Sequence, residues 1–220
     1  MTSAPEDGGA TLDWRELPKP TDYRYLLPEN WFALDPSPSR SMKSIKRIAD
    51  ARIRRFPPLE PHRKELMRVL RMQANDARKN GIEKIHMLAE PITDDIVMSA
   101  SMVVAEARGL PLGGSAATND PELITEWQRR IVPDEQIDDE FRSVDLVDLT
   151  QLPAVRVRAM IRTEDEEGRQ IIGLGVQFHI PVPGSSDLVL LTFNTPDLAI
   201  AEQMTLLFDM IAQTFYFVWE

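Results

Sequence analysis

Polar and apolar residues alternate along much of the last third of the chain, in the pattern of strands from a half-covered sheet. Residues 153–161 place their aliphatic side chains on one face and Arg156 and Arg158 on the other. Residues 170–180 place Gln177 and His179 opposite a second aliphatic row. Residues 188–193 are apolar on both faces, which is typical of a central strand covered on both sides. The three segments predict an antiparallel meander.

A helix is predicted to follow the meander and to pack against it. Thr195 and Pro196 suit its N-cap and first helical position, and Asp197 would lie near the positive end of the helix dipole. The apolar residues that follow recur at helical spacing and define the side expected to be buried: Ile200, Ala201, Met204, Phe208, Ile211 and Phe215.

Two short strands and two amphipathic helices are predicted nearer the N-terminus. The strands cover residues 23–27 and 31–34, and the helices cover residues 41–55 and 61–80. The apolar side of the first helix comprises Met42, Ile45, Ile48, Ala49 and Ile53. That of the second comprises Leu66, Val69, Leu70, Gln73 and Ala77. Gly81 suits the residue that ends a helix in a left-handed conformation.

The middle of the chain predicts two strands, over residues 82–89 and 96–107, followed by a small-residue loop over 109–119. Asp120 and Pro121 begin a short helix that extends to residue 130. An acidic loop over 133–139 and an extended segment over 141–149 lead into the meander. Short connections between neighbouring strands predict an α+β fold, an antiparallel sheet with helices packed on its faces. We expect residues 1–20 to form a flexible acidic tail rich in Pro and Gly, and residues 21–220 to form one domain.

Composition limits the classes of function. The 220 residues include no cysteine, which excludes disulfides, thiolate metal sites and a cysteine nucleophile. No apolar run approaches the roughly 20 residues that span a bilayer. The first residues lack the basic and apolar regions of a secretory signal, so a cytoplasmic location is the expectation.

The net charge of −10 is distributed unevenly along the chain. Residues 40–80 contain 13 of the 25 Lys and Arg residues and four of the 35 acidic residues, so this segment has a charge of +9 and the remainder −19. Such a chain presents one basic and one acidic surface, a property that bears on association.

The beginning and the end of the chain, and the order of its predicted elements (strands, then helix, then a long meander), resemble the Mog1/PsbP-like proteins, which are α/β/α sandwiches. The stretch Tyr25-Leu-Leu-Pro-Glu-Asn-Trp31 is similar to the opening strand and turn of that family. Leu191-Thr-Phe-Asn-Thr-Pro196 and Phe208-Asp-Met-Ile-Ala-Gln-Thr-Phe215 are similar to its last strand and closing helix. The pair of helices in residues 41–80 is longer and more basic than the resemblance implies. Members of this family are binding accessories, among them a regulator of a small GTPase, a photosystem assembly subunit and actinobacterial cell-envelope proteins. The resemblance therefore implies a binding protein, and it transfers no site residue.

Candidate catalytic and metal-binding residues are scattered. His62, His86 and His179 are far apart in sequence and show no paired spacing, so no metal site is predicted. The serine in Gly113-Gly-Ser-Ala116 lacks the setting of a nucleophile elbow. Gly173 and Gly175 lie within a strand, where close approach of a neighbouring chain is a better explanation than nucleotide binding. The acidic runs at 94–95, 138–140 and 164–167 fall at predicted turns. We expect no catalytic residue, no cofactor and no enzymatic activity.

The cations of the two helices form the main candidate site: Lys43, Lys46, Arg47, Arg54, Lys64, Arg68, Arg71 and Arg78. Two interpretations remain open, a solvated face balanced by the acidic remainder, or a surface that docks an acidic partner, including a second copy of the chain. Nucleic acid is disfavoured, because no aromatic residues lie among the cations and the remainder would repel it. The alternative hypothesis is a ligand pocket on the sheet formed by Arg156, Arg158, Gln177 and His179.

Overall fold

A computed structural model describes residues 16–82, 84–91, 97–108, 120–130, 137–150, 152–164 and 170–219. Most of the predicted tail, the loop over 109–119 and the serine within it lie outside these residues. So do most of the acidic residues of the run at 164–167 and those of the run at 94–95.

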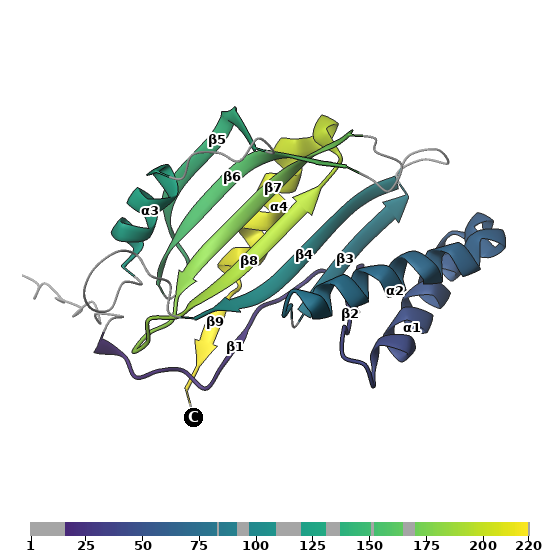
Figure 1. The fold of residues 1–220 in the computed structure, drawn as a ribbon, viewed down its shortest axis with the longest axis horizontal. Coiled ribbons are helices and arrows are strands. Elements are labelled where there is room, and N and C mark those ends of the chain that lie inside the picture. Colours follow the sequence, from purple (N-terminus) through teal and green to yellow (C-terminus); the bar gives the residue numbers. More distant parts are fainter. Residues whose placement is uncertain are drawn as a thin grey trace, which may run out of the picture.

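The fold is α+β and is built on a seven-stranded sheet in which every neighbouring pair is antiparallel (Figure 1). The order across the sheet is β2-β3-β4-β8-β7-β6-β5, and β8 lies in the interior, as its apolar pattern predicts. The strands are β2 (Trp31–Leu34), β3 (Lys84–Pro91), β4 (Val97–Ala107), β5 (Ile137–Asp148), β6 (Pro153–Glu164), β7 (Gln170–Pro181) and β8 (Leu188–Thr195). The predicted meander is therefore confirmed.

Strand β5 corrects one expectation. It begins at Ile137, so residues 137–139 belong to a strand and not to an acidic loop. The pairing of β5 with β6 shifts register between Asp138 and Ser143, which marks a β-bulge or similar irregularity in this strand pair.

One face of the sheet, which we call the core face, is covered by α4 (Ala201–Gln213). Phe208 of this helix stacks on Phe193 of β8 with ring centroids 4.8 Å apart, and Phe193 meets Phe178 of β7 edge to face. A separate two-stranded sheet of β1 (Asp22–Arg24) and β9 (Tyr216–Val218) contributes Tyr23 and Phe217 to the same core. The predicted buried side of the closing helix is confirmed.

The helix begins later than predicted. Thr195 is the last residue of β8, where it pairs with Leu174, and a short 3₁₀ turn, η3 (Leu198–Ile200), precedes α4. The Thr195 hydroxyl donates to the carbonyl of Ser99 (2.7 Å) and accepts from the backbone N–H of Asp197 (3.1 Å). Sheet pairing therefore holds this threonine in the strand, and its hydroxyl stabilises the turn and not a helix N-terminus.

Two helical units pack at opposite ends of the other face, which we call the open face. At one end α1 (Ser41–Arg55) and α2 (Arg63–Lys79) lie on β2 and β3, and at the other end α3 (Pro121–Arg130) lies on β5 and β6 (Figure 1). The α/β/α layering is thus present, with the centre of the open face lying between the two units. The pair α1–α2 extends past the β2 edge of the sheet.

The connections of α1 and α2 follow from Pro and Gly. Residues Pro57–His62 form a 3₁₀ segment, η2, so α2 begins at Arg63 and not at Pro61. The prolines of this segment lack backbone N–H donors, which disfavours an α-helical ladder there. At the other end Gly81 has a φ of 68°, and the N–H of Ile82 donates to the carbonyl of Ala77 (2.9 Å). The predicted glycine terminator is confirmed, in the hydrogen-bond pattern of a Schellman motif.

Truncation of Phe208 is expected to test the core directly. Phe208 is fully buried, so Phe208→Ala removes a stacked ring and leaves a cavity, and we expect a loss of about 3–5 kcal/mol in the free energy of unfolding. The control is Met210→Ala on the exposed side of the same helix, expected to change this free energy by less than about 0.5 kcal/mol. Urea unfolding followed by circular dichroism measures both, and equal losses in the two variants would contradict the assigned core.

Candidate functional site

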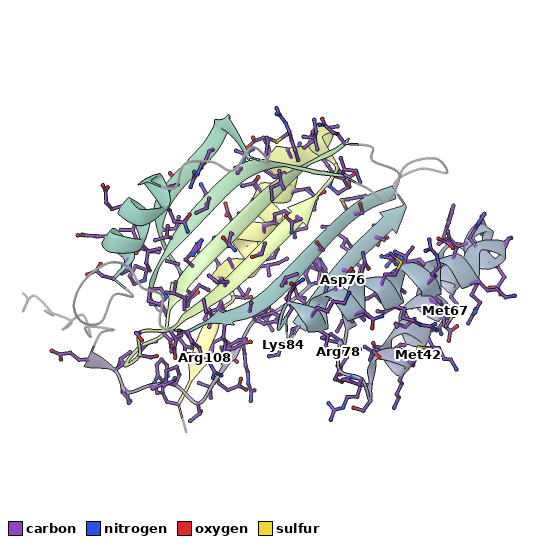
Figure 2. All side chains as sticks on the ribbon, viewed as in Figure 1. Met42, Met67, Asp76, Arg78, Lys84 and Arg108 are labelled. Atoms are coloured by element: carbon purple, nitrogen blue, oxygen red, sulfur yellow. The ribbon has the colours of Figure 1, made fainter. Side chains whose placement is uncertain are left out.

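The eight predicted cations of α1 and α2 are all exposed to solvent. Each helix buries one side against β2 and β3 through residues such as Ile45, Ile48 and Leu70, so the cationic side is turned away from the sheet. Figure 2 shows the side chains that project from this helical pair, with Met42 and Arg78 labelled on it. We call these eight residues the basic surface: Lys43, Lys46, Arg47, Arg54, Lys64, Arg68, Arg71 and Arg78.

Acidic side chains neutralise little of the basic surface. Arg68 pairs with Glu65 one turn before it, at 2.6 Å. Arg47, Arg54 and Arg78 donate to the backbone carbonyls of Ala33, Asp50 and Pro36, which leaves their charge uncompensated. Lys43, Lys46 and Lys64 form no ion pair or hydrogen bond with another described residue.

Two side-chain contacts join α1 and α2, the helices that carry the basic surface. Arg71 of α2 donates to the Met42 sulfur of α1 over 3.6 Å, and Arg63 of α2 forms an ion pair with Asp50 of α1. The first of these contacts places Arg71, one of the eight cations, against α1. Basic residues in the last turns of both helices also interact favourably with the helix dipoles.

The alternative pocket on the sheet is not assembled. The register of β6 and β7 pairs Val155 with His179 and Val157 with Gln177. Because side chains alternate between faces along a strand, Arg156 and Arg158 point to the core face and Gln177 and His179 to the open face. The sheet itself separates the two pairs, so the hypothesis of one pocket that contains all four residues is wrong.

The two arginines instead attach α4 to the sheet. Arg156 donates to Asp209 of α4 (2.7 Å) and to Asp145 of β5 (3.2 Å), and Arg158 donates to Glu202 of α4 (2.5 Å). Burial alone would lower the pKa of Arg156, but the hydrogen bonds and charges of Asp209 and Asp145 outweigh it and raise this pKa. These contacts are those of a structural ion-pair network.

His179 and Gln177 form hydrogen bonds within the protein on the other side of the sheet. The side-chain nitrogen of Gln128 in α3 lies 3.2 Å from Nε2 of His179, and Gln177 donates to the Thr192 hydroxyl of β8 (2.8 Å). Burial lowers the pKa of His179 to about 4. The imidazole is therefore neutral near pH 7 and connects α3 with the sheet.

A second buried histidine, His86, faces the core side near β1. Its Nε2 lies 2.8 Å from the Tyr25 hydroxyl, and burial together with the positive charge of Lys84 lowers its pKa to about 4. Burial raises the pKa of Tyr25 to about 12. Both rings are thus uncharged near pH 7. Among the described residues no three His, Asp or Glu side chains gather as a metal site would require.

A cleft between α2 and the open face of the sheet was not foreseen from the sequence. It has a volume of about 600 Å³, and its walls include Leu66 and Val69 of α2, Ala89 of β3, Ser101 of β4 and Gly173 of β7. Val69 and Gln73, which were expected to share the buried side of α2 with Leu70, are exposed at this cleft, and Leu70, Ala74 and Ala77 are buried. The only sign of this cleft in the sequence is the small size of side chains on the central strands, such as Ser101 and Gly173.

The two glycines of β7 support the sheet as the sequence predicts. A Cβ on Gly175 would lie 2.2 Å from the side chain of Ile161 on β6, so the absence of a side chain admits that isoleucine. A neighbouring large side chain, and not a nucleotide, occupies this position.

Removal of the acid that pairs with Arg156 is expected to loosen α4. Asp209→Asn leaves the partly buried guanidinium with one carboxylate in place of two, and we expect a loss of about 1–2 kcal/mol in the free energy of unfolding. Glu202→Gln, at the more exposed pair with Arg158, is the matched control and is expected to cost less than about 0.5 kcal/mol. Chemical denaturation measures both variants, and a cost for Glu202→Gln that equals the cost for Asp209→Asn would refute this assignment.

The two buried histidines predict a loss of stability in acid. Each has a folded-state pKa of about 4, below its unfolded value of about 6.5, so between these values the unfolded chain binds protons that the folded chain does not. The free energy of unfolding should therefore fall as the pH drops through this window, by up to about 3 kcal/mol for each histidine. Urea titrations between about pH 7 and pH 4 test this, with His179→Gln expected to flatten the dependence. An equally steep dependence in that variant would exclude His179 as a contributor.

Comparisons with known proteins give one structural likeness. No family model and no curated protein matches the chain. Among solved structures, the fold is similar to LpqN of Mycobacterium tuberculosis, a protein described as involved in cell envelope biogenesis. The TM-score is 0.44 and the sequence identity 10%, and the match covers 92% of this chain and 87% of LpqN. No helix within the described residues is both long and apolar enough to cross a membrane. The likeness concerns the arrangement of the sheet and its helices.

Proposed function

We propose that this protein is a non-enzymatic accessory or adaptor that docks an acidic surface of another protein through its basic surface. The observation that carries the proposal is the state of the eight cations: all are exposed, and among described carboxylates only Glu65 forms an ion pair with one of them. Cations that are already paired internally gain little from a partner, whereas these can release free energy on contact with carboxylates.

The shape of the helical pair supports the same proposal. The pair α1–α2 extends past the edge of the sheet (Figure 1), so part of it does not lie over the sheet. Steering by opposite charges would accelerate the encounter and make it sensitive to salt. The charge of −19 outside residues 40–80 also makes a second copy of the chain an acceptable acidic partner.

The proposal includes a kinship with the Mog1/PsbP-like proteins. What supports it is the order of the elements, with two short strands, a helical unit and a meander followed by a closing helix. The resemblance at Tyr25–Trp31 falls on the turn into β2, and the one at Leu191–Pro196 falls on the end of β8. The family resemblance was to binding accessories, in agreement with a docking role.

Neutralisation of the unpaired lysines tests the proposal. The triple variant Lys43→Gln, Lys46→Gln and Lys64→Gln keeps helix propensity and removes three exposed charges that have no described partner. The control carries Arg24→Gln, Arg108→Gln and Arg162→Gln, three exposed cations outside the helical pair, so both variants have the same net charge.

The measurement is quantitative co-purification from a native extract at low and high salt, followed by titration with each partner that is identified. We expect affinity to fall at least about tenfold in the lysine variant and to stay within about twofold in the control. Equal retention of the partner by both variants would refute the proposal. Sedimentation tests the case in which the partner is a second copy, where the lysine variant is expected to remain monomeric.

A further inference from the structure

The cleft between α2 and the open face has the size and lining of a small-molecule site. Its volume of about 600 Å³ falls within the range of roughly 300–1,000 Å³ that is usual for such sites. A smaller cavity of about 180 Å³ adjoins it and shares Arg52, Leu66 and Ala89 with it. The smaller cavity is bordered by α1 and β2, and the larger one extends to the central strands β4, β8 and β7.

Apolar side chains in this space remain exposed. Val69 of α2 is 40% exposed and Ile171 of β7 is 43% exposed, and both line the larger cavity. Apolar groups that face each other across a cleft gain free energy when a ligand displaces water from them. Ser99, Ser101 and Asn194 add uncharged polar groups to the floor on β4 and β8.

Arg52 is the single charged side chain among the described residues that line the larger cavity. Its Nε is buried and has no hydrogen-bond partner, and no described carboxylate forms an ion pair with its guanidinium. Its neighbour Arg55 lines only the smaller cavity and is already paired with Glu90 at 2.5 Å. Burial lowers the pKa of Arg52, which reflects the cost of a desolvated cation without a counter-ion.

We propose that the cleft binds a single-chain fatty carboxylate, with the carboxylate on Arg52 and the acyl chain along the apolar lining. One guanidinium matches the two oxygens of one carboxylate in a bidentate pair and balances a single negative charge. A phosphate monoester carries up to two negative charges, and the single guanidinium of this lining balances only one of them. The acyl chain would cover the exposed Val69 and Ile171.

This inference is independent of the docking proposal. Arg52 lies on the sheet-facing side of α1 and is not a member of the basic surface, so the two sites can be removed separately. A variant can lose ligand binding and keep the protein partner, or lose the partner and keep ligand binding. Either result would show that the two sites are separate, so that one proposal can fail without the other.

The test is isothermal titration of the full chain with octanoate, decanoate and dodecanoate below their micellar concentrations. We expect one site per chain and an affinity that tightens roughly threefold to fourfold for each added methylene. Dodecyl phosphate and dodecyltrimethylammonium serve as probes of the head group, and both are expected to bind at least about tenfold more weakly than dodecanoate.

Three variants locate the site. Arg52→Met keeps an unbranched apolar stem and removes the charged guanidinium, and it is expected to weaken dodecanoate binding at least about tenfold. Ser101→Phe places a ring in the cleft, and Val69→Glu places a like charge beside the ligand; both are expected to abolish binding. Arg40→Met, at the exposed residue directly before α1, is the matched control and is expected to leave binding unchanged. Val69→Glu alters an exposed helical position, so it remains informative if Ser101→Phe does not fold.

Several outcomes would overturn the proposal. The first is the absence of saturable binding by dodecanoate. The second is binding that Arg52→Met and Val69→Glu leave unchanged, which would place the ligand elsewhere. The third is an affinity for dodecyltrimethylammonium equal to that for dodecanoate, which would show that the guanidinium does not select the head group. The fourth is tighter binding of dodecyl phosphate than of dodecanoate, which would identify a different head group.

Discussion

The alternation of side chains between the two faces of the sheet is the constraint on which the rest of this structure depends. Once β6, β7 and β8 pair in their observed register, Val176, Phe178 and Phe193 all point to the core face. A shift of one residue in any of these strands would transfer its whole apolar row to the opposite face. The packing of α4, and through it of β1 and β9, follows from this register.

The same alternation separates the polar residues of the meander into two structural groups. Arg156 and Arg158 meet the acids of α4 and β5, whereas Gln177 and His179 form hydrogen bonds across the open face. Each of these four side chains therefore forms at least one hydrogen bond within the protein. Among the described residues, cations without an ion pair lie on the exposed sides of α1 and α2 and at Arg52 in the cleft.

The placement of the helices on the open face explains both proposals. The pair α1–α2 covers β2 and β3, and α3 covers β5 and β6, so neither unit covers the central strands completely. One side of α2 therefore faces solvent with its cations, and part of its other side borders an apolar cleft. A single amphipathic helix thus contributes to a charged surface for macromolecular contact and to a cavity for an apolar chain.

The sequence by itself determined the elements and much of their burial. Periodicity identified the strands of the meander, both amphipathic helices and the apolar side of α4, and Gly81 marked the end of α2, because these features depend on neighbours within a few residues. Tertiary structure alone decided the strand register, which placed Arg156 and His179 on opposite faces, and the pairing of Thr195, which delayed the start of α4. It alone brought Arg52, Val69 and Ile171 to one cleft, since these residues come from α1, α2 and β7 and share no local pattern. Contacts between segments distant in sequence carry no periodic signal, and they are formed only when the sheet assembles.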